Sequence, residues 1–162
     1  MAGIAFFQPI DSELDSLAYQ STLVSSLPYE TIRIGDSGSI TKTITDEDLI
    51  QFAKLTGDVN PIHVDDKYAK TTQFQGRIAH GMLVASYIST ILGTKLPGKD
   101  TIYLSQHIQF KKPVKIGDTL TITATVIQKR DDKKIITLKT EVTNQQREVV
   151  LTGTANVMKI EK

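Results

Sequence analysis

The sequence predicts an α+β domain in which an antiparallel sheet wraps around one long, buried helix. Residues 82–92 indicate the helix, because they are apolar on almost every side and are interrupted only by small Ser and Thr residues. We expect this helix to end at Gly93. The sheet is indicated by segments rich in Thr, Ile and Val, at residues 101–110, 119–129, 134–144 and 148–158. Antiparallel strands that follow a buried helix are typical of the α+β class.

Alternation in the second of these segments indicates a sheet with one buried face. Its threonines fall on one side of the predicted strand. The opposite side carries the apolar residues Leu120, Ile122, Ala124 and Val126. A period of two between polar and apolar residues is typical of an antiparallel strand with one face in the core.

One strand and two further helices are predicted ahead of the buried helix. Residues 39–44 alternate in the manner of a strand. A helix is expected to follow, because Thr45 can cap its N-terminus, three acidic residues occupy its first turn, and Gly57 can end it. Its apolar side includes Leu55. A shorter helix is expected at residues 65–71.

Length and composition indicate an ordinary globular chain. Its 162 residues suffice for one core, so we expect an N-terminal extension at residues 1–30 and a single domain at residues 31–162. A formal net charge of +1 argues against a nucleic-acid partner. The longest apolar-rich stretch is too short to span a bilayer, and cysteine is absent. These features lead us to expect a soluble, cytoplasmic protein that does not bind membranes.

The stretch GDVNPIH at residues 57–63 concentrates chemically active side chains. It places Asp58, Asn60 and His63 around Pro61, through which we expect no regular helix to run. Asp58 alone would more often serve as a turn residue. Together with His63 on one rigid loop, it can instead hold a single water molecule.

Three stretches carry a resemblance to a known family. They are FAKLTGDVNPIHVDDKYA, IAHGMLVAS and YLSQHIQFKKPVKIGD. They resemble the MaoC-like hydratase family, specifically the (R)-specific enoyl-CoA hydratases, over residues 34–157. The family motif is met by Phe52, Gly57, Asp58, Asn60, Pro61, Ile62, His63 and Ala69. The closing segment at residues 143–160 is also similar to the hydratase part of bifunctional enoyl-CoA hydratase/phosphate acetyltransferase proteins.

The resemblance implies a hot-dog fold and the reversible hydration of trans-2-enoyl-CoA to (R)-3-hydroxyacyl-CoA. Such a reaction needs a base for the water, a proton source for C2 and a donor for the developing oxyanion. Asp58 and His63 are the candidates that activate the water. The backbone N–H of Gly81, at the start of the buried helix, is the candidate donor to the thioester carbonyl.

Supporting roles are expected for two residues. Asn60 can hydrogen-bond the turn between the catalytic pair. Ser86 resembles a family serine that lies close to the acid, so it can orient Asp58, although a small serine also suits a buried helix by its size alone. His80 is expected to be a structural residue at the helix start, and His107 a packed or surface residue.

Other functions are weighed against this one. The same chemistry on an acyl-carrier-protein thioester would make the protein a 3-hydroxyacyl dehydratase. A non-catalytic acyl-CoA-binding module is a further alternative, but it has no need of the Asp58 and His63 pair. Residues 81–94 contain no acid, unlike the central helix of many hot-dog thioesterases and dehydratases. The histidines lack HExxH spacing, so we expect no metal and no cofactor, with coenzyme A as part of the substrate.

Assembly is expected because a single sheet wrapped on one helix leaves an unpaired edge strand and an open site. We therefore expect a homodimer or higher homo-oligomer, with the acyl pocket at or near its interface. Apart from the acyl-CoA substrate, no further partner is indicated by the residues.

Overall fold

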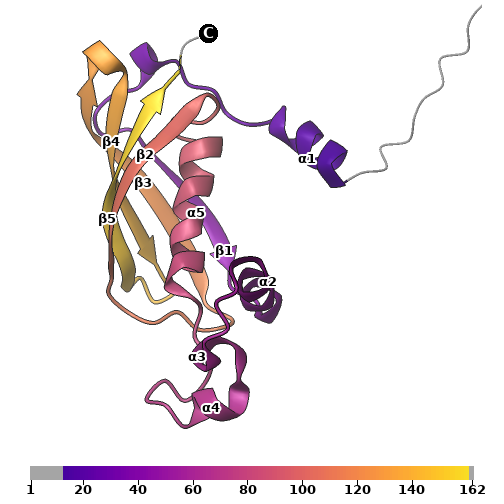
Figure 1. Cartoon of the computed structure of the whole chain (residues 1–162). Coiled ribbons are helices and arrows are strands. Elements are labelled where there is room, and N and C mark those ends of the chain that lie inside the picture. The colour runs from indigo at the N-terminus through magenta and orange to yellow at the C-terminus, as the bar shows by residue number, and fades with distance from the viewer. Residues whose placement is uncertain (1–12, 161–162) are drawn as a thin grey trace, which may run out of the picture.

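A five-stranded antiparallel sheet packs against one long helix, α5, in the computed structural model, which describes residues 13–160. The strand order is β1-β3-β4-β5-β2 (Figure 1). The strands are β1 (Ser37–Thr43), β2 (Thr101–Phe110), β3 (Thr119–Arg130), β4 (Ile135–Thr143) and β5 (Val149–Lys159). The helices are α1 (Glu13–Ser21), α2 (Asp46–Thr56), α3 (Pro61–Val64), α4 (Asp66–Lys70) and α5 (Gly81–Thr94), with short 3₁₀ turns η1 (Tyr29–Thr31) and η2 (Asp131–Lys133). The predicted α+β architecture is confirmed.

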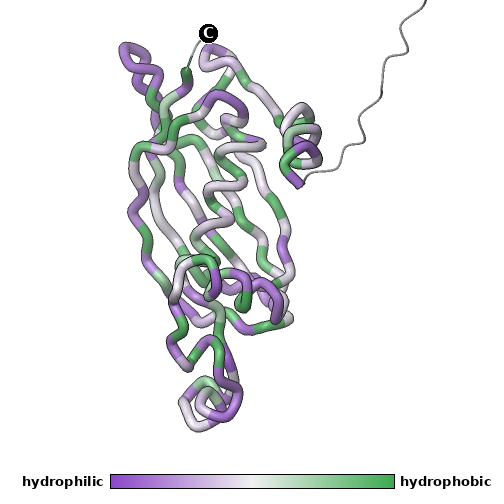
Figure 2. The backbone as a smooth tube through the Cα atoms, turned by 45° about the vertical axis from the view of Figure 1, so that its right-hand side comes forward, coloured by the Kyte–Doolittle hydropathy of each residue, from purple (hydrophilic) through white to green (hydrophobic). Residues whose placement is uncertain are grey.

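The core lies between α5 and the sheet. The helix buries its apolar face, which comprises Leu83, Val84, Ala85, Ile88, Ile91 and Leu92. The predicted inward face of β3 is buried as expected, from Leu120 to Val126. Figure 2 shows that hydrophobic segments follow α5 and the strands, whereas the turn between β3 and β4 is hydrophilic. No helix within the described residues is both long enough and apolar enough to cross a membrane.

The single chain leaves part of α5 uncovered, although the sequence predicts a helix that is buried on most sides. One stripe of the helix is exposed, and it consists of Met82, Ser86, Ser89, Thr90 and Gly93. These positions recur at helical spacing on the side that the sheet does not cover. Gly93 also does not end the helix, because α5 continues to Thr94.

Residues close to the N-terminus of the described chain pack onto the far end of α5. The backbone of Ser25 donates to Thr94 and accepts from Lys99, at 3.1 and 2.7 Å. Tyr29 is buried in the core. The segment leading into β1 is therefore joined to the body of the protein. The division of the chain at residue 31 into an extension and a domain stays a prediction.

Helix α2 has the boundaries that its capping residues predict. Thr45 and Asp48 form a capping box, and Gly57 ends the helix with a φ of 79°, in the left-handed region that favours glycine. Leu55, however, is 85% exposed, so its assignment to the apolar side is wrong. The predicted helix at residues 65–71 is confirmed as α4.

No helix runs through the whole of GDVNPIH, as expected, because residues 57–60 are not helical, but the expectation that Asp58 and His63 lie on one loop is wrong. His63 lies within α3, which begins at Pro61. Proline suits the first helical position because its fixed φ matches the helix and its missing N–H has no partner there. Asn60 caps α3 by accepting a hydrogen bond from the Ile62 N–H at 3.3 Å. The same proline that breaks a helix interior therefore starts a new one.

The capping box of α2, the helix that precedes GDVNPIH, can be tested at Asp48. Burial opposes its ionisation, but hydrogen bonds from Thr45 and Lys42 outweigh burial and lower the pKa of its carboxyl group. A lowered pKa in the folded state contributes stability at neutral pH that is lost as the pH falls through that pKa. We expect Asp48→Asn to lower the free energy of unfolding by about 1 kcal/mol at pH 7, and the difference to shrink progressively as the pH falls below about 4. Urea unfolding at both pH values measures it.

Glu47→Gln is the matched control, because Glu47 lies in the same helical turn but forms no part of the capping box. An equal and equally pH-dependent loss in both variants would contradict the assigned role of Asp48.

Candidate active site

Asp58 follows the glycine that ends α2 and lies in a hydrogen-bonded turn. Its backbone N–H donates to the Thr56 hydroxyl at 3.3 Å, and its carboxylate accepts from the Asn60 N–H at the same distance. The carboxylate is exposed. Asn60 in turn caps α3, as described above. The expected hydrogen bond of Asn60 to the turn is therefore present, and a continuous set of local bonds joins Asp58 to the helix that carries His63.

His63 is half-buried, and one of its ring nitrogens is already engaged. Its Nδ1 lies 2.8 Å from the backbone carbonyl oxygen of Ile78. A carbonyl oxygen only accepts, so Nδ1 carries the proton in this bond. In the neutral ring, Nε2 then has a free lone pair. His63 is thus prepared to accept a proton at Nε2.

His80 is buried and contacts both Asp58 and His63. It is 1% exposed, and its Nε2 donates to the backbone carbonyl of Asp58 at 3.0 Å. Its ring stacks on that of His63 with centroids 4.0 Å apart, and it also contacts Phe52. Its Nδ1 has no hydrogen-bond partner among residues 13–160. Sequence reasoning gave His80 a structural role, but its contact with both members of the pair required the fold.

Asp58, His63 and His80 form one cluster. Their ligand atoms all lie within 4.8 Å of one another, so the cluster invites comparison with a metal site. Ligand atoms around a tetrahedral zinc ion are closer, about 3.3 Å apart, because each bond measures about 2.0–2.1 Å. Each ring engages one nitrogen with a carbonyl oxygen, an arrangement found in both catalytic and metal-binding histidines, so the spacing is the observation that decides. The arrangement suits acid–base chemistry better than metal binding.

Gly81 joins the cluster to a cavity. The cavity has a volume of about 300 Å³, and its lining includes His63, Gly81, Val84 and Phe110. Gly81 is the first residue of α5, so its N–H has no partner within the helix. A Cβ atom at this position would lie 2.9 Å from the Phe110 ring. The absence of a side chain therefore lets the aromatic ring approach the start of the helix.

Comparison with known proteins gives the family. Residues 35–148 match the family model described as "MaoC like domain". The chain belongs to this family. The stretch that carries Asp58, His63, His80 and Gly81 lies within the match. The five-stranded antiparallel sheet around α5 is accordingly a hot-dog fold.

Three relatives within the MaoC-like family are named as (R)-hydratases. An (R)-specific enoyl-CoA hydratase of Rhodospirillum rubrum is 49% identical over 130 residues, which cover 80% of this chain and 90% of the relative. An enzyme of the same name from Aeromonas caviae is 41% identical over 128 residues, or 79% of this chain and 96% of the relative. The solved structure of R-hydratase PhaJ1 from Pseudomonas aeruginosa has a TM-score of 0.82 at 42% identity, covering 86% of this chain and 89% of that one.

Ser86 belongs to the exposed stripe of α5. Its hydroxyl donates to the Leu83 carbonyl at 2.6 Å, one turn back along α5. It also lines a second cavity of about 600 Å³, together with Phe52, Thr56, Leu104 and other residues of α5 and β2. Its role in orienting Asp58 stays a prediction.

Proposed function

We propose that this MaoC-like protein is a hydro-lyase that adds water reversibly to trans-2-enoyl-CoA and forms (R)-3-hydroxyacyl-CoA. The observation that carries the proposal is the cluster of Asp58 and His63 beside a cavity that also contains Gly81. The (R)-specific enoyl-CoA hydratases among the relatives support the substrate and the stereochemistry.

The proposed reaction uses one water molecule. Asp58 and His63 hold it, and the free Nε2 of His63 accepts one of its protons. The oxygen bonds to C3, the π bond between C2 and C3 breaks, and negative charge develops on the thioester oxygen. The Gly81 N–H donates to that oxygen. The pair then returns the proton to C2 on the same face. Addition is therefore syn, the substrate gains one water molecule, and the enzyme is left unchanged.

The hydrogen bond between His63 and Ile78 supports this division of roles. It holds the proton on Nδ1, so Nε2 is an acceptor without any prior proton transfer. The exposed carboxylate of Asp58 supplies the second group that can exchange a proton with water or C2. A protein that only bound acyl-CoA would gain nothing from this pair, which disfavours the non-catalytic alternative.

The proposal has three further parts. The choice of coenzyme A over an acyl-carrier protein follows the names of the two most similar hydratases described above. The expectation that the enzyme needs no cofactor stays a prediction, as does its cytoplasmic location.

The pair is tested by substitution. We expect Asp58→Asn and His63→Ala each to lower kcat by about 10²-fold or more, the scale of general acid–base catalysis. Loss of enoyl-CoA absorbance measures hydration, and circular dichroism verifies the fold. Asp132→Asn is the control, because that carboxylate is exposed on the turn between β3 and β4. Near-normal hydration by a folded Asp58→Asn protein would disprove the mechanism.

We further propose that the acyl tail enters the second cavity. This cavity is mainly apolar and lies between α5 and β2, with Ser86 in its lining. Ser89, three residues further on, is exposed and is not among the lining residues. A larger side chain at position 86 would therefore reduce the cavity, whereas a larger side chain at position 89 would not.

The tail is tested with those two serines. We expect Ser86→Leu to suppress activity on a C8 enoyl-CoA by roughly tenfold or more relative to crotonyl-CoA, because overpacking costs roughly 1–3 kcal/mol for a chain that needs the space. Ser89→Leu is the matched control and should preserve the ratio. Equal losses on C4 and C8 substrates in Ser86→Leu would show that the tail lies elsewhere.

We also propose that the protein is a homodimer joined along β2. This strand pairs only with β5 in the described sheet, so its other edge is open. It exposes large apolar side chains, including Ile102 at 43%, Leu104 at 46% and Phe110 at 54%. An open, apolar edge strand is a surface that proteins normally cover.

The proposed dimer can be tested by placing a charged side chain on β2. We expect light scattering to give the mass of a dimer at micromolar concentration, and Leu104→Glu to shift the protein to monomer because burying an unpaired carboxylate is costly. Ile127→Glu is the control, since Ile127 is 48% exposed on the interior strand β3. A stable, active monomer of the unmodified chain would contradict the proposal.

A further inference from the structure

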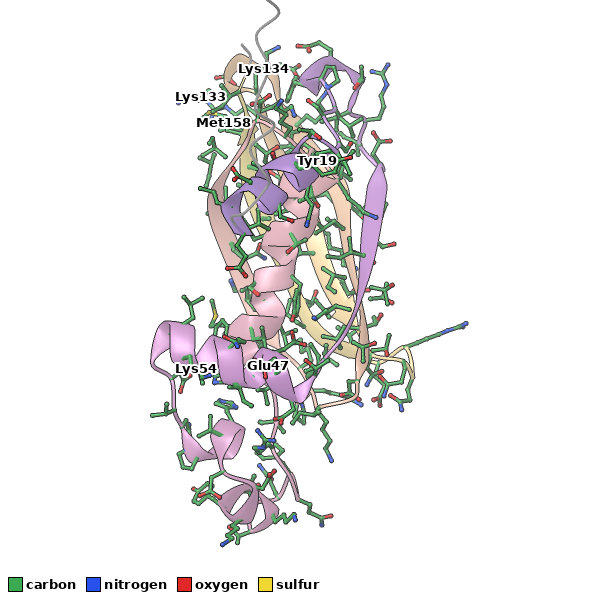
Figure 3. The ribbon with its side chains drawn as sticks, turned by 90° about the vertical axis from the view of Figure 1, so that its right-hand side faces the viewer. Tyr19, Glu47, Lys54, Lys133, Lys134 and Met158 are labelled. Atoms are coloured by element: carbon green, nitrogen blue, oxygen red, sulfur yellow. The ribbon has the colours of Figure 1, made fainter. Side chains whose placement is uncertain are left out.

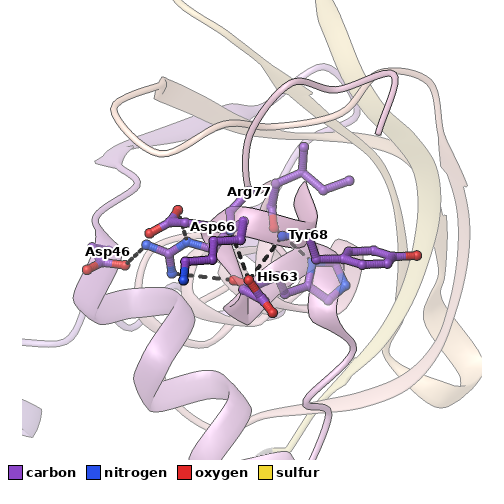
Figure 4. A network of polar contacts seen from close by, with 8 residues as sticks. Asp46, His63, Asp66, Tyr68 and Arg77 are labelled. Carbon is purple, nitrogen blue, oxygen red and sulfur yellow. Dashed lines mark hydrogen bonds and ion pairs between the residues drawn. The ribbon is translucent and has the colours of Figure 1, made fainter. Parts of the chain in front are cut away.

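Arg77 is a largely buried charge close to the candidate site. Its side chain is only 11% exposed. Its Nη2 donates to Asp46 at 2.6 Å and its Nε donates to Asp66 at 2.8 Å (Figure 4). Both carboxylates are more exposed than the guanidinium, at 55% and 69%. Removal of either acid would leave part of the charge of this guanidinium without compensation, whereas the exposed carboxylates can be hydrated without it.

The same arginine reaches the backbone of His63. Its Nη1 lies 3.5 Å from the His63 carbonyl oxygen. The next residue, Ile78, accepts the hydrogen bond from the His63 ring and donates its own N–H to the Ile62 carbonyl at 3.3 Å. Two consecutive residues therefore hold the backbone and the ring of His63.

The helices joined by Arg77 have little apolar core of their own. Helix α3 buries no residue, and α4 buries only Ala69. Their position therefore depends on polar contacts more than on packing. Asp66 lies in the first turn of α4, directly after the helix that carries His63.

The ion pair between Arg77 and Asp46 connects Arg77 to Asp58 through helix α2. Asp46 is the first residue of α2, and Asp58 follows the glycine that ends this helix. Because a helix is stiff along its axis, holding one end limits the movement of the other. Arg77 thus connects the helix that delivers Asp58 with the two helices that surround His63.

We propose that Arg77 is a positioning residue that holds His63 and Asp58 at their working separation. The role rests on the proposed hydratase function, and Arg77 itself touches no reacting atom. A planar guanidinium can bridge two carboxylates and a carbonyl at once, whereas the ammonium group of lysine is a point charge. Arginine is therefore the side chain that this junction requires.

The kinetic test compares Arg77→Met with Arg130→Met. Arg130 also pairs with a carboxylate, Asp132, on the turn between β3 and β4. Figure 3 shows Lys133 and Lys134 of this turn at the opposite end of the molecule from Glu47 of α2. We expect Arg77→Met to lower kcat by about 10²-fold with KM changed less than about threefold, since small displacements of catalytic groups have effects of this size. Arg77→Lys should recover part of the loss, and Arg130→Met should lose less than about twofold.

A second measurement is independent of activity. The chain has three histidines, so the ring signals of His63 can be assigned by comparison with His63→Ala. We expect the ¹H–¹³C and ¹⁵N signals of the His63 ring to shift in Arg77→Met and to stay in place in Arg130→Met. A native protein that hydrates no enoyl thioester would refute the proposed function, and the His63 signals would still decide whether Arg77 positions the ring.

Unchanged His63 signals in a folded Arg77→Met protein, or a kcat equal to that of Arg130→Met, would overturn the assignment. If Arg77→Met does not fold, Asp46→Asn and Asp66→Asn each remove one partner and keep the arginine. A lowered kcat and shifted His63 signals in these variants would support the positioning role. Native values in both would overturn it.

Discussion

The burial of α5 against one face of the sheet is the constraint on which the rest of the structure depends. Side chains such as Leu83, Ile88 and Ile91 are almost completely buried there. Burial of each contributes about 1.5–3 kcal/mol. This packing fixes the axis of the helix and therefore the place of its first residues, His80 and Gly81. The candidate site is assembled around that end of α5, so the core determines where the chemistry can occur.

Hydrogen bonds to backbone carbonyls then organise the site. Ile78 holds the proton of His63 on Nδ1, and the Asp58 carbonyl holds that of His80 on Nε2. The two rings stack with their planes inclined by 28°, which keeps them close. The rings of His63 and His80 are thus each oriented by a main-chain carbonyl group, which shifts less readily than a side chain does. Preorganisation of this kind lowers the cost of reaching the transition state, because the groups need not be reordered during the reaction.

Two surfaces that the single chain leaves uncovered meet at one cavity. Met82 and Ser86 of the exposed stripe of α5 line the second cavity together with residues of the edge strand β2. Its lining includes Met82, which is 60% exposed, and Leu104. A second copy that covered this region would close the cavity from outside. Substrate pocket and subunit interface would then be formed by the same residues.

Local features of the structure were determined by the sequence alone. The capping box at Thr45 and Asp48, the glycine end of α2 and the alternation of β3 involve residues within a few positions of one another, so their physical basis is visible in the residue order. The motif around Asp58 and His63 was recognisable for the same reason. Even here the local reading failed once, because a proline that excludes a helix interior also suits the first position of α3.

Only the tertiary structure decided which distant residues complete the site. His80 contacts Asp58 from 22 positions away, and Arg77 contacts Asp46 from 31 positions away. No spacing rule relates such pairs, because their separation is set by how α2 and α5 pack and not by the geometry of one element. The exposed stripe of α5 was likewise undetermined by composition, since small Ser and Thr residues are compatible with both a buried and an open helix face. Which face was open depended on the extent of the sheet that one chain can supply.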